Sequence, residues 1–337
     1  MTTTTMHARD PRLEARAVVG PDLEPAVLEP SPPAVTIGPW FADDPIAGTD
    51  PDRPLLLPAG HGATDAPNWT TWLAAHPEHT DWAAERWLAG PRRLPPTPAA
   101  LVPTRRSLHR LAAYVIAPAR HAVTGKFGLR WSLGGFGTPF FGDDRQLRVE
   151  GDRLVDQRGG VARSVPITTL RAASEFLGVA VDAETAAEHD TPAVGDIDAP
   201  LVVDETASRF LGPWFGMAFA ALEAFRADVR SVDPSRPQLW PGHFDPALEE
   251  GDEDHRASYG ASPGDDGIDE PYLYVSVWWP DRLGVSRDDV PFWDAPSFTG
   301  RVLRVSEFPS GDPVEVAASF WAETRDALQE APGRSDG

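Results

Sequence analysis

The stretch that decides the fold is Glu-Pro-Tyr-Leu-Tyr-Val-Ser-Val-Trp-Trp, at residues 270–279. Alternate side chains in it differ in kind, and one set is apolar: Leu273, Val275, Val277 and Trp279. The other set is Glu270, Tyr272, Tyr274, Ser276 and Trp278. Because successive side chains of a β-strand point to opposite faces, this alternation predicts a strand with one face in the core. Its second face would be an aromatic, polar platform.

Outward from this strand, the spacing of apolar residues switches between the helical and the strand period. The helical spacing predicts helices over 104–117, from Thr168 or Thr169 to Gly178, from Asp204 to a point before Pro234, and from Asp312 to Leu328. The alternating spacing predicts strands over 129–133, 147–149 and 162–167, with turns at Gly134-Gly135 and Gly151-Asp152. The predicted helices and strands do not alternate strictly along the chain, as they would in a parallel α/β sheet. The predicted fold class is therefore α+β, with a mostly antiparallel sheet and packed helices.

Prolines set the expected domain organisation. They recur every few residues from Pro21 to Pro58, which removes N–H donors and prevents regular helix. We therefore expect residues 1–58 to form a proline-rich arm that is extended or partly disordered. Residues 59–330 are expected to form a single α+β domain, helical over 68–117 and sheet-containing over 126–330. Tryptophans on the first two short helical patterns would pack against the main body: Trp69, Trp72, Trp82 and Trp87.

The composition excludes several classes of function. The 337 residues include 51 Asp and Glu against 30 Lys and Arg, and this formal charge of −21 argues against binding of nucleic acid or anionic membranes. There is no cysteine, which rules out disulfides, thiolate metal sites and cysteine nucleophiles. The longest apolar stretches fall short of the roughly 18 residues that cross a bilayer, and the N-terminus does not resemble a secretory signal. We therefore expect an acidic, soluble, cytoplasmic protein.

The densest cluster of chemically active residues begins at 238–245, Gln-Leu-Trp-Pro-Gly-His-Phe-Asp. In an extended conformation His243 and Asp245 would share a face, about 7 Å apart along the strand, and both could reach one ligand. His243 would then be the general base of an enzyme, with Asp245 or Glu270 as the carboxylate that orients it. In a purely structural alternative, His243 and Asp245 bond to each other or to turn amides and hold the bend at Pro241.

Aromatic side chains would form the walls of a pocket beside this cluster. The candidates are Trp240, Tyr272, Tyr274 and Trp278. Arg130 could hold a carboxylate or phosphate of the ligand, because a guanidinium forms paired hydrogen bonds with such groups. Together these residues predict a site with aromatic walls and a few ionisable groups.

A metal site has less support in the sequence. Two loops end in Gly-Asp-Asp, at 142–144 and 264–266, and paired aspartates can hold Mg²⁺ or Ca²⁺. The candidate ligands are His243, Asp245 and Asp265, although their spacing matches no recognised metal motif. The acidic run at 249–255 is expected to be a solvated loop. Because the dinucleotide, Walker, zinc-protease and Gly-x-Ser-x-Gly motifs are all absent, the sequence identifies no cofactor.

Three motifs identify the chain more specifically. They are Trp240-Pro241-Gly242-His243-Phe244-Asp245, Ser262-Pro263-Gly264-Asp265 and Glu270-Pro271-Tyr272-Leu273-Tyr274. Together they resemble the signature of an uncharacterised bacterial family, a domain of unknown function common in actinobacteria. The likeness extends back through 134–139 and 108–112, covers roughly 101–328, and leaves the proline-rich arm outside. It implies a shared fold and a shared pocket, but no reaction, cofactor or catalytic residue.

Three functions stay open on this evidence. The first is small-molecule binding, or an enzyme of undetermined reaction, with a pocket near 240–245 and 270–278. The second is a non-catalytic interaction protein that docks another chain, or its own copy in a homodimer, through the arm and the tryptophan-bearing helices. The third is metal-dependent hydrolysis. The sequence does not decide whether a reaction takes place.

Overall fold

A computed structural model describes part of the chain: residues 4–7, 70, 73–74, 77, 80–85, 87 and 90–331 without 133, 140, 143–144, 159–160, 190, 284–292 and 296. Apart from residues 4–7, the predicted arm lies outside the described residues, as do Trp69, Trp72 and the side chain of Trp82. The described chain forms helices and two antiparallel sheets, which confirms the predicted α+β class.

The chain divides into two compact units, and each is described by itself. Unit 1 comprises Met1–Leu55, Pro95–Gly216 and Gln238–Asp245, and unit 2 comprises Leu56–Leu94, Met217–Pro237 and Pro246–Gly337. The single domain expected over 59–330 stays a prediction, because compactness does not decide whether two units unfold together.

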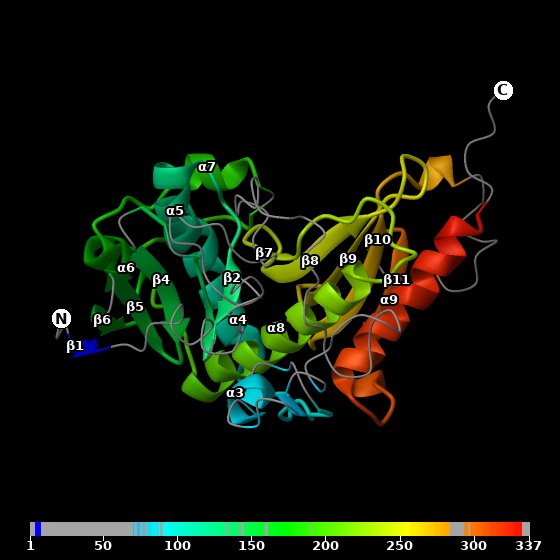
Figure 1. The fold of residues 1–337 in the computed structure, drawn as a ribbon. Coiled ribbons are helices and arrows are strands. Elements are labelled where there is room, and N and C mark those ends of the chain that lie inside the picture. Colours follow the sequence, from blue (N-terminus) through cyan, green and yellow to red (C-terminus); the bar gives the residue numbers. More distant parts are fainter. Residues whose placement is uncertain are drawn as a thin grey trace. The chain divides into compact units, whose positions relative to one another are not determined.

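Unit 1 is built on an antiparallel sheet with the strand order β1-β6-β5-β4-β3-β2 (Figure 1). The strands are β1 (Thr4–His7), β2 (Arg130–Ser132), β3 (Gly135–Gly137), β4 (Arg145–Glu150), β5 (Arg153–Arg158) and β6 (Val161–Pro166). Strands β2, β4 and β6 confirm the three predicted ones. The predicted turn at Gly151-Asp152 joins β4 to β5, with Glu150 opposite Arg153, because a two-residue loop with Gly at positive φ closes a hairpin.

The two faces of this sheet differ in chemistry. One face carries Trp131, Phe136, Leu147, Val149 and Leu154, none of them more than 5% exposed. Phe215 of helix α8 (Glu205–Arg226) meets Phe136 edge to face, with ring centroids 6.5 Å apart. This face is therefore the core of unit 1. The opposite face carries Arg130, Gln146, Arg148 and Gln157, which are polar and yet buried.

One predicted helix end in unit 1 is wrong. The sequence placed the end of the first long helix at Pro118, but α4 (Leu101–Leu111) continues through the π-helical turn η2 (Ala112–Ile116) into α5 (Ala117–Thr124). Pro118 lies in the first turn of α5, after the π turn, where a missing N–H costs little. Gly125 ends the helix in the left-handed conformation.

Two further helices of unit 1 follow their capping residues. Helix α6 (Leu170–Leu177) begins after Thr169, whose hydroxyl accepts a hydrogen bond from the Ala172 N–H at 3.0 Å. It ends at Gly178, as predicted, because glycine takes the left-handed cap conformation at little cost. Helix α7 (Ala183–Ala187) is capped in the same way by Asp182.

Helix α8 begins in unit 1 and ends in unit 2. It ends before Pro234 as predicted, but Val229, which continues the helical spacing of the apolar residues Leu222 and Phe225, lies beyond the helix and is 84% exposed. The cause is Asp228, whose carboxylate accepts a hydrogen bond from the Arg230 N–H and so competes with the helical pattern. Strand β7 (Gln238–Trp240) then returns to unit 1, where Leu239 and Leu129 exchange two backbone hydrogen bonds.

In unit 2 the antiparallel sheet runs in the order β11-β10-β9-β8 (Figure 1). The strands are β8 (Asp245–Glu250), β9 (Ala257–Ser262), β10 (Tyr272–Val277) and β11 (Gly300–Arg304). The stretch at 270–279 supplies β10, and Leu273 and Val275 on its apolar face are fully buried, as predicted. The placement of Trp279 on that core face is wrong, because β10 ends at Val277 and Trp279, beyond the strand, is 47% exposed.

The acidic run at 249–255 departs from its prediction. Asp252 and Glu253 are exposed, as expected of a solvated loop, but Glu249 and Glu250 belong to β8 and Glu250 is fully buried. Burial of this carboxyl is tolerated because it accepts hydrogen bonds from the Ser231 hydroxyl at 3.2 Å and the Val232 N–H at 3.4 Å.

Helix α9 (Pro313–Gln329) confirms the last predicted helix and packs beside β10 (Figure 1). Asp312 caps it by accepting a hydrogen bond from the Val314 N–H at 3.1 Å. Trp321 is fully buried, and its indole N–H donates to the Tyr274 carbonyl at 3.2 Å. Short helices complete the described chain: α3 (Thr80–Glu85), η3 (Pro280–Arg282) and η5 (Val305–Glu307). In the part of the chain described above, no helix has the length and apolar character needed to span a membrane.

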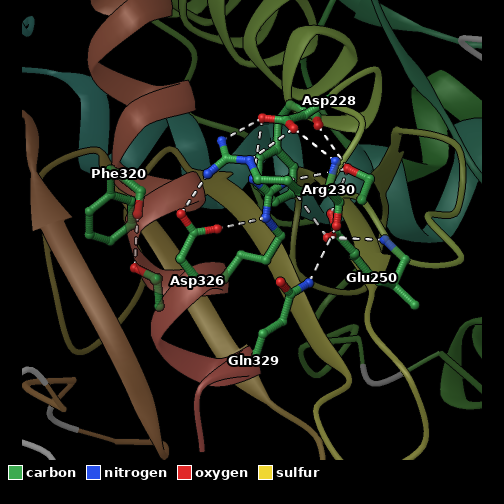
Figure 2. Close-up of polar contacts among 11 residues, drawn as sticks. Asp228, Arg230, Glu250, Phe320, Asp326 and Gln329 are labelled. Atoms are coloured by element: carbon green, nitrogen blue, oxygen red, sulfur yellow. Dashed lines mark hydrogen bonds and ion pairs between the residues drawn. The ribbon is translucent and has the colours of Figure 1, made fainter.

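A polar cluster ties α9 to β8 and to the loop after α8, within unit 2 (Figure 2). At its centre is Arg325, 1% exposed, with Nη2 3.3 Å from Asp228 Oδ2 and Nη1 3.8 Å from Glu250 Oε1. Arg230 bridges Asp228 and Asp326, each at 2.6 Å. The buried guanidinium is therefore surrounded by acidic side chains, which stabilise an ion buried away from water.

Candidate functional site

The motif Trp240 to Asp245 forms a turn rather than the extended segment that was expected. The Phe244 N–H donates to the Trp240 carbonyl at 2.7 Å, and Phe244 has a φ of 61°. A left-handed conformation is unfavourable for a bulky residue, and it is kept here by packing. The Phe244 ring is 1% exposed and lies edge to face with Phe136 at 4.9 Å and with Phe215 at 5.5 Å.

His109 of α4 forms hydrogen bonds with the backbone of this turn. Its Nε2 lies 2.9 Å from the carbonyl oxygens of Pro241 and of Gly242, and its ring stacks on Phe244 at 5.4 Å. Because carbonyl oxygens only accept, Nε2 must carry the hydrogen. Burial lowers the pKa of His109 to about 4, against the opposing effect of the two carbonyls, and the nearby charges of His243 and Arg105 lower it further. The imidazole is therefore neutral at physiological pH.

The turn separates the two residues that an extended strand would have brought to one face. His243 is exposed at the turn, whereas Asp245 is 3% exposed at the start of β8. Trp240, the first wall residue, is half-buried at the end of β7. The catalytic assignment of His243, Asp245 and Glu270 stays a prediction. Of the three, His243 is exposed to solvent and therefore accessible to a dissolved ligand.

Arg130, the predicted anion-binding residue, lies on the polar face of the six-stranded sheet. It is opposite Gly137 of β3, and Gly137 is in turn opposite Arg148 of β4. Directly opposed residues of antiparallel strands point to the same face, so Arg130, Gly137 and Arg148 form one row across the sheet. Each arginine is 8% exposed.

Gly137 leaves the centre of this row without a side chain. A Cβ at this position would come within 2.4 Å of the Leu147 carbonyl oxygen and 2.5 Å of the Arg148 Cβ, so only glycine fits the close approach of the two strands. The consequence is that the side chains of Arg130 and Arg148 flank a position that carries no side chain of its own.

Amide side chains orient the second arginine. The Arg148 Nη1 donates to Gln157 Oε1 at 2.6 Å and to Gln146 Oε1 at 3.3 Å, and its Nε donates to Glu150 at 2.5 Å. Gln146 in turn donates to the Thr138 carbonyl at 3.2 Å. A buried network of this kind restricts the rotamers of its members. Sequence reasoning missed Arg148, Gln146 and Gln157, although Arg148 sits between the apolar Leu147 and Val149 and so faces away from the core.

The predicted site residues of unit 2 have local partners. Asp265 accepts hydrogen bonds from the N–H groups of Gly267 and Ile268, both at 2.7 Å, and from the Tyr272 hydroxyl. Glu270 accepts from the Ser306 N–H at 3.1 Å and hydroxyl at 2.9 Å, which fixes the turn η5. These carboxylates therefore stabilise turns of unit 2.

The predicted tyrosine platform is partly a second hydrophobic cluster. Tyr272, 4% exposed, packs with Ile268, Ala295 and Val302, and Tyr274 packs against the same cluster. Trp278 is the member of this face that meets solvent, with 39% of its surface exposed. The described residues contain no group of three or more histidines and carboxylates arranged to hold a metal.

When compared with models of known protein families, with curated proteins and with solved structures, the chain matches none. The family resemblance of the three motifs therefore stays a prediction, and the site rests on its own geometry.

Proposed function

We propose that this protein binds a small molecule through an anionic group, a carboxylate or a phosphate, on the polar face of the sheet in unit 1. The observation that carries the proposal is the row Arg130, Gly137 and Arg148, in which two buried guanidinium side chains border a position without a side chain.

Geometry supports this choice of ligand. Neighbouring strands are about 4.8 Å apart, so the Cα atoms of Arg130 and Arg148, two strands apart, are separated by about 10 Å. Long side chains rooted at that distance can lean toward one group above Gly137. A planar guanidinium presents N–H donors in the geometry of a carboxylate or phosphate, which favours these groups over a neutral ligand.

The surroundings favour an anion as well. The groups next to Arg148 are mostly neutral amides, with Glu150 as its ion-pair partner. Low exposure makes any anion contact strong, because little water screens it. The same low exposure restricts direct contact to a small group, so the rest of the ligand would lie outside this row.

An enzymatic version adds one residue. His243 is exposed in the same unit and would act as the general base, as its type and position allow. His243→Ala then separates the two versions, because a binding protein keeps its ligand affinity while an enzyme loses turnover.

The test measures binding of four anions to the full-length protein. ³¹P NMR detects binding of inorganic phosphate, and calorimetry detects binding of acetate, succinate and citrate. Arg130→Lys and Arg148→Lys keep the charge but lose the paired donors, so each should weaken the best anion about tenfold. Arg163→Lys is the matched control, because Arg163 lies on the other face of the same sheet and pairs with Asp156. Failure of all four anions to bind, or equal affinity in all three variants and the wild type, would refute the proposal.

A further inference from the structure

Two adjacent tryptophans of unit 2 stand out at the surface. Trp278 is 39% exposed and Trp279 is 47% exposed, and their rings meet edge to face with centroids 6.5 Å apart. Tryptophan is the side chain with the most apolar area, and its exposure costs the protein solubility. Trp278 is also fixed in place, since its indole N–H donates to the Ser258 hydroxyl at 2.8 Å. An exposed and ordered aromatic pair is typical of a binding surface.

The rings already receive cations from their own chain. The guanidinium carbon of Arg256 lies 5.5 Å from the centroid of Trp278, and that of Arg282 lies 5.0 Å from Trp279. Both distances fall within the range of cation–π attraction. One face of each indole thus already stacks on a guanidinium of the same chain, so a partner's guanidinium would meet the part of each ring that is still exposed.

Carboxylates surround the two rings. Arg256 pairs with Asp233 at 3.1 Å and with Glu249 at 3.6 Å, and Arg282 pairs with Glu253 at 2.9 Å. The side chains of Asp233 and Glu253 are 84% and 85% exposed, so most of each carboxylate still faces water. The neighbouring sequence adds Asp252, Asp254 and Asp281. Negative charge therefore exceeds positive charge around the rings.

We propose that this surface, the tryptophan patch formed by Trp278, Trp279 and the carboxylates of Asp233 and Glu253, docks an arginine-rich segment of another protein. Arginine satisfies both halves of the patch, because its planar guanidinium stacks on an indole and pairs with a carboxylate at the same time. Lysine offers only the second of these interactions at full strength. The proposal is independent of the anion site in unit 1.

A second copy of this chain is a poor occupant of the patch. Each chain carries a formal charge of −21, and two identical acidic patches brought together would repel each other. A basic partner instead gains from long-range attraction, which speeds its encounter with the patch.

The experiment measures fluorescence anisotropy of a labelled nine-residue peptide of alternating Arg and Gly, titrated with the full-length protein at 50 mM salt. Matched peptides replace every Arg with Lys, or with Glu. We expect the Arg peptide to bind more tightly than the Lys peptide, and the Glu peptide not to bind. Trp279→Leu keeps an apolar side chain, although a smaller one, and removes the aromatic face, so it should weaken the Arg peptide about two- to fivefold and the Lys peptide less. Glu253→Gln should weaken both peptides alike.

Val229→Ala serves as the control, because Val229 is an apolar residue of unit 2 outside the patch and, at 84%, is even more exposed than the two tryptophans. It should leave all affinities unchanged. Absence of binding by the Arg peptide overturns the proposal. The proposal is also overturned if the Arg and Lys peptides bind equally well and Trp279→Leu changes neither affinity, since that result shows attraction by net charge alone.

Discussion

Replacing Glu250 with glutamine should change how the stability of the protein depends on pH. Glu250 is fully buried, and burial raises its pKa to about 7 although Arg325 and the hydrogen bonds from Val232 and Ser231 oppose the rise. In the unfolded chain the carboxyl returns to its ordinary pKa of about 4.5. The folded protein therefore holds a proton that the unfolded chain releases between these two values.

The sign follows from this difference in bound protons. The stability that protonated Glu250 contributes is complete below about pH 4.5 and is lost as the pH rises through 7. Two and a half pKa units correspond to about 3 kcal/mol over the whole range. Between pH 5.5 and pH 8.5 the loss amounts to about 2 kcal/mol, and this window avoids the low solubility expected near the isoelectric point of 4.7.

The measurement is urea unfolding of the wild type and of Glu250→Gln, followed by tryptophan fluorescence, at four pH values from 5.5 to 8.5. Glutamine keeps the size and cannot ionise, so the difference in unfolding free energy between the two proteins should shift by about 2 kcal/mol in favour of the variant as the pH rises. Glu253→Gln removes the same charge from an exposed site and should track the wild type. A wild-type to Glu250→Gln difference that is constant with pH would show that Glu250 is ionised throughout, and the reasoning from burial would be wrong.

Two other consequences of the structure can be measured directly. His109 should titrate near pH 4 in an NMR titration of the imidazole resonances, and a midpoint near its ordinary 6.5 would contradict its burial against Phe244. Gly260→Ala should destabilise the protein by about 1–3 kcal/mol in thermal unfolding, because the added Cβ would lie 2.5 Å from the Tyr274 ring. In a Tyr274→Leu background the same substitution should cost much less, and an equal loss in both backgrounds would exclude this clash as the cause.

The sequence predicted those parts of the fold that follow from local patterns. Thr169 and Asp312 cap helices where the sequence placed them, and β10 buries Leu273 and Val275 as its alternation predicted, because these features depend on neighbours within a few residues. Predictions from local sequence patterns were wrong where contacts with residues distant in the sequence determine the structure. The π turn that carries the helix past Pro118 and the burial of Glu250 both depend on packing that no window of sequence contains.

The candidate site shows the same division. Arg130 was recognised by its chemistry, but its relation to Arg148 depends on strand pairing through Gly137, which sequence spacing does not reveal. His243 and Asp245 were placed on one face on the assumption of an extended chain. The positive φ of Phe244 breaks that assumption, and it is stabilised by rings from three other segments of unit 1.

The titrations of Glu250 and His109 act in opposite directions, and this bears on the prediction of a single domain. Neutral His109 contributes stability that is complete above its ordinary pKa of 6.5 and is lost as the pH falls toward 4, so unit 1 gains stability with rising pH while unit 2 loses it. Each effect amounts to at most about 3 kcal/mol. If residues 59–330 unfold as one cooperative domain, the two effects nearly cancel and the wild-type stability is almost flat between pH 5 and pH 7. If the units unfold separately, calorimetry resolves two transitions whose midpoints move apart or together with pH, and the single-domain prediction fails.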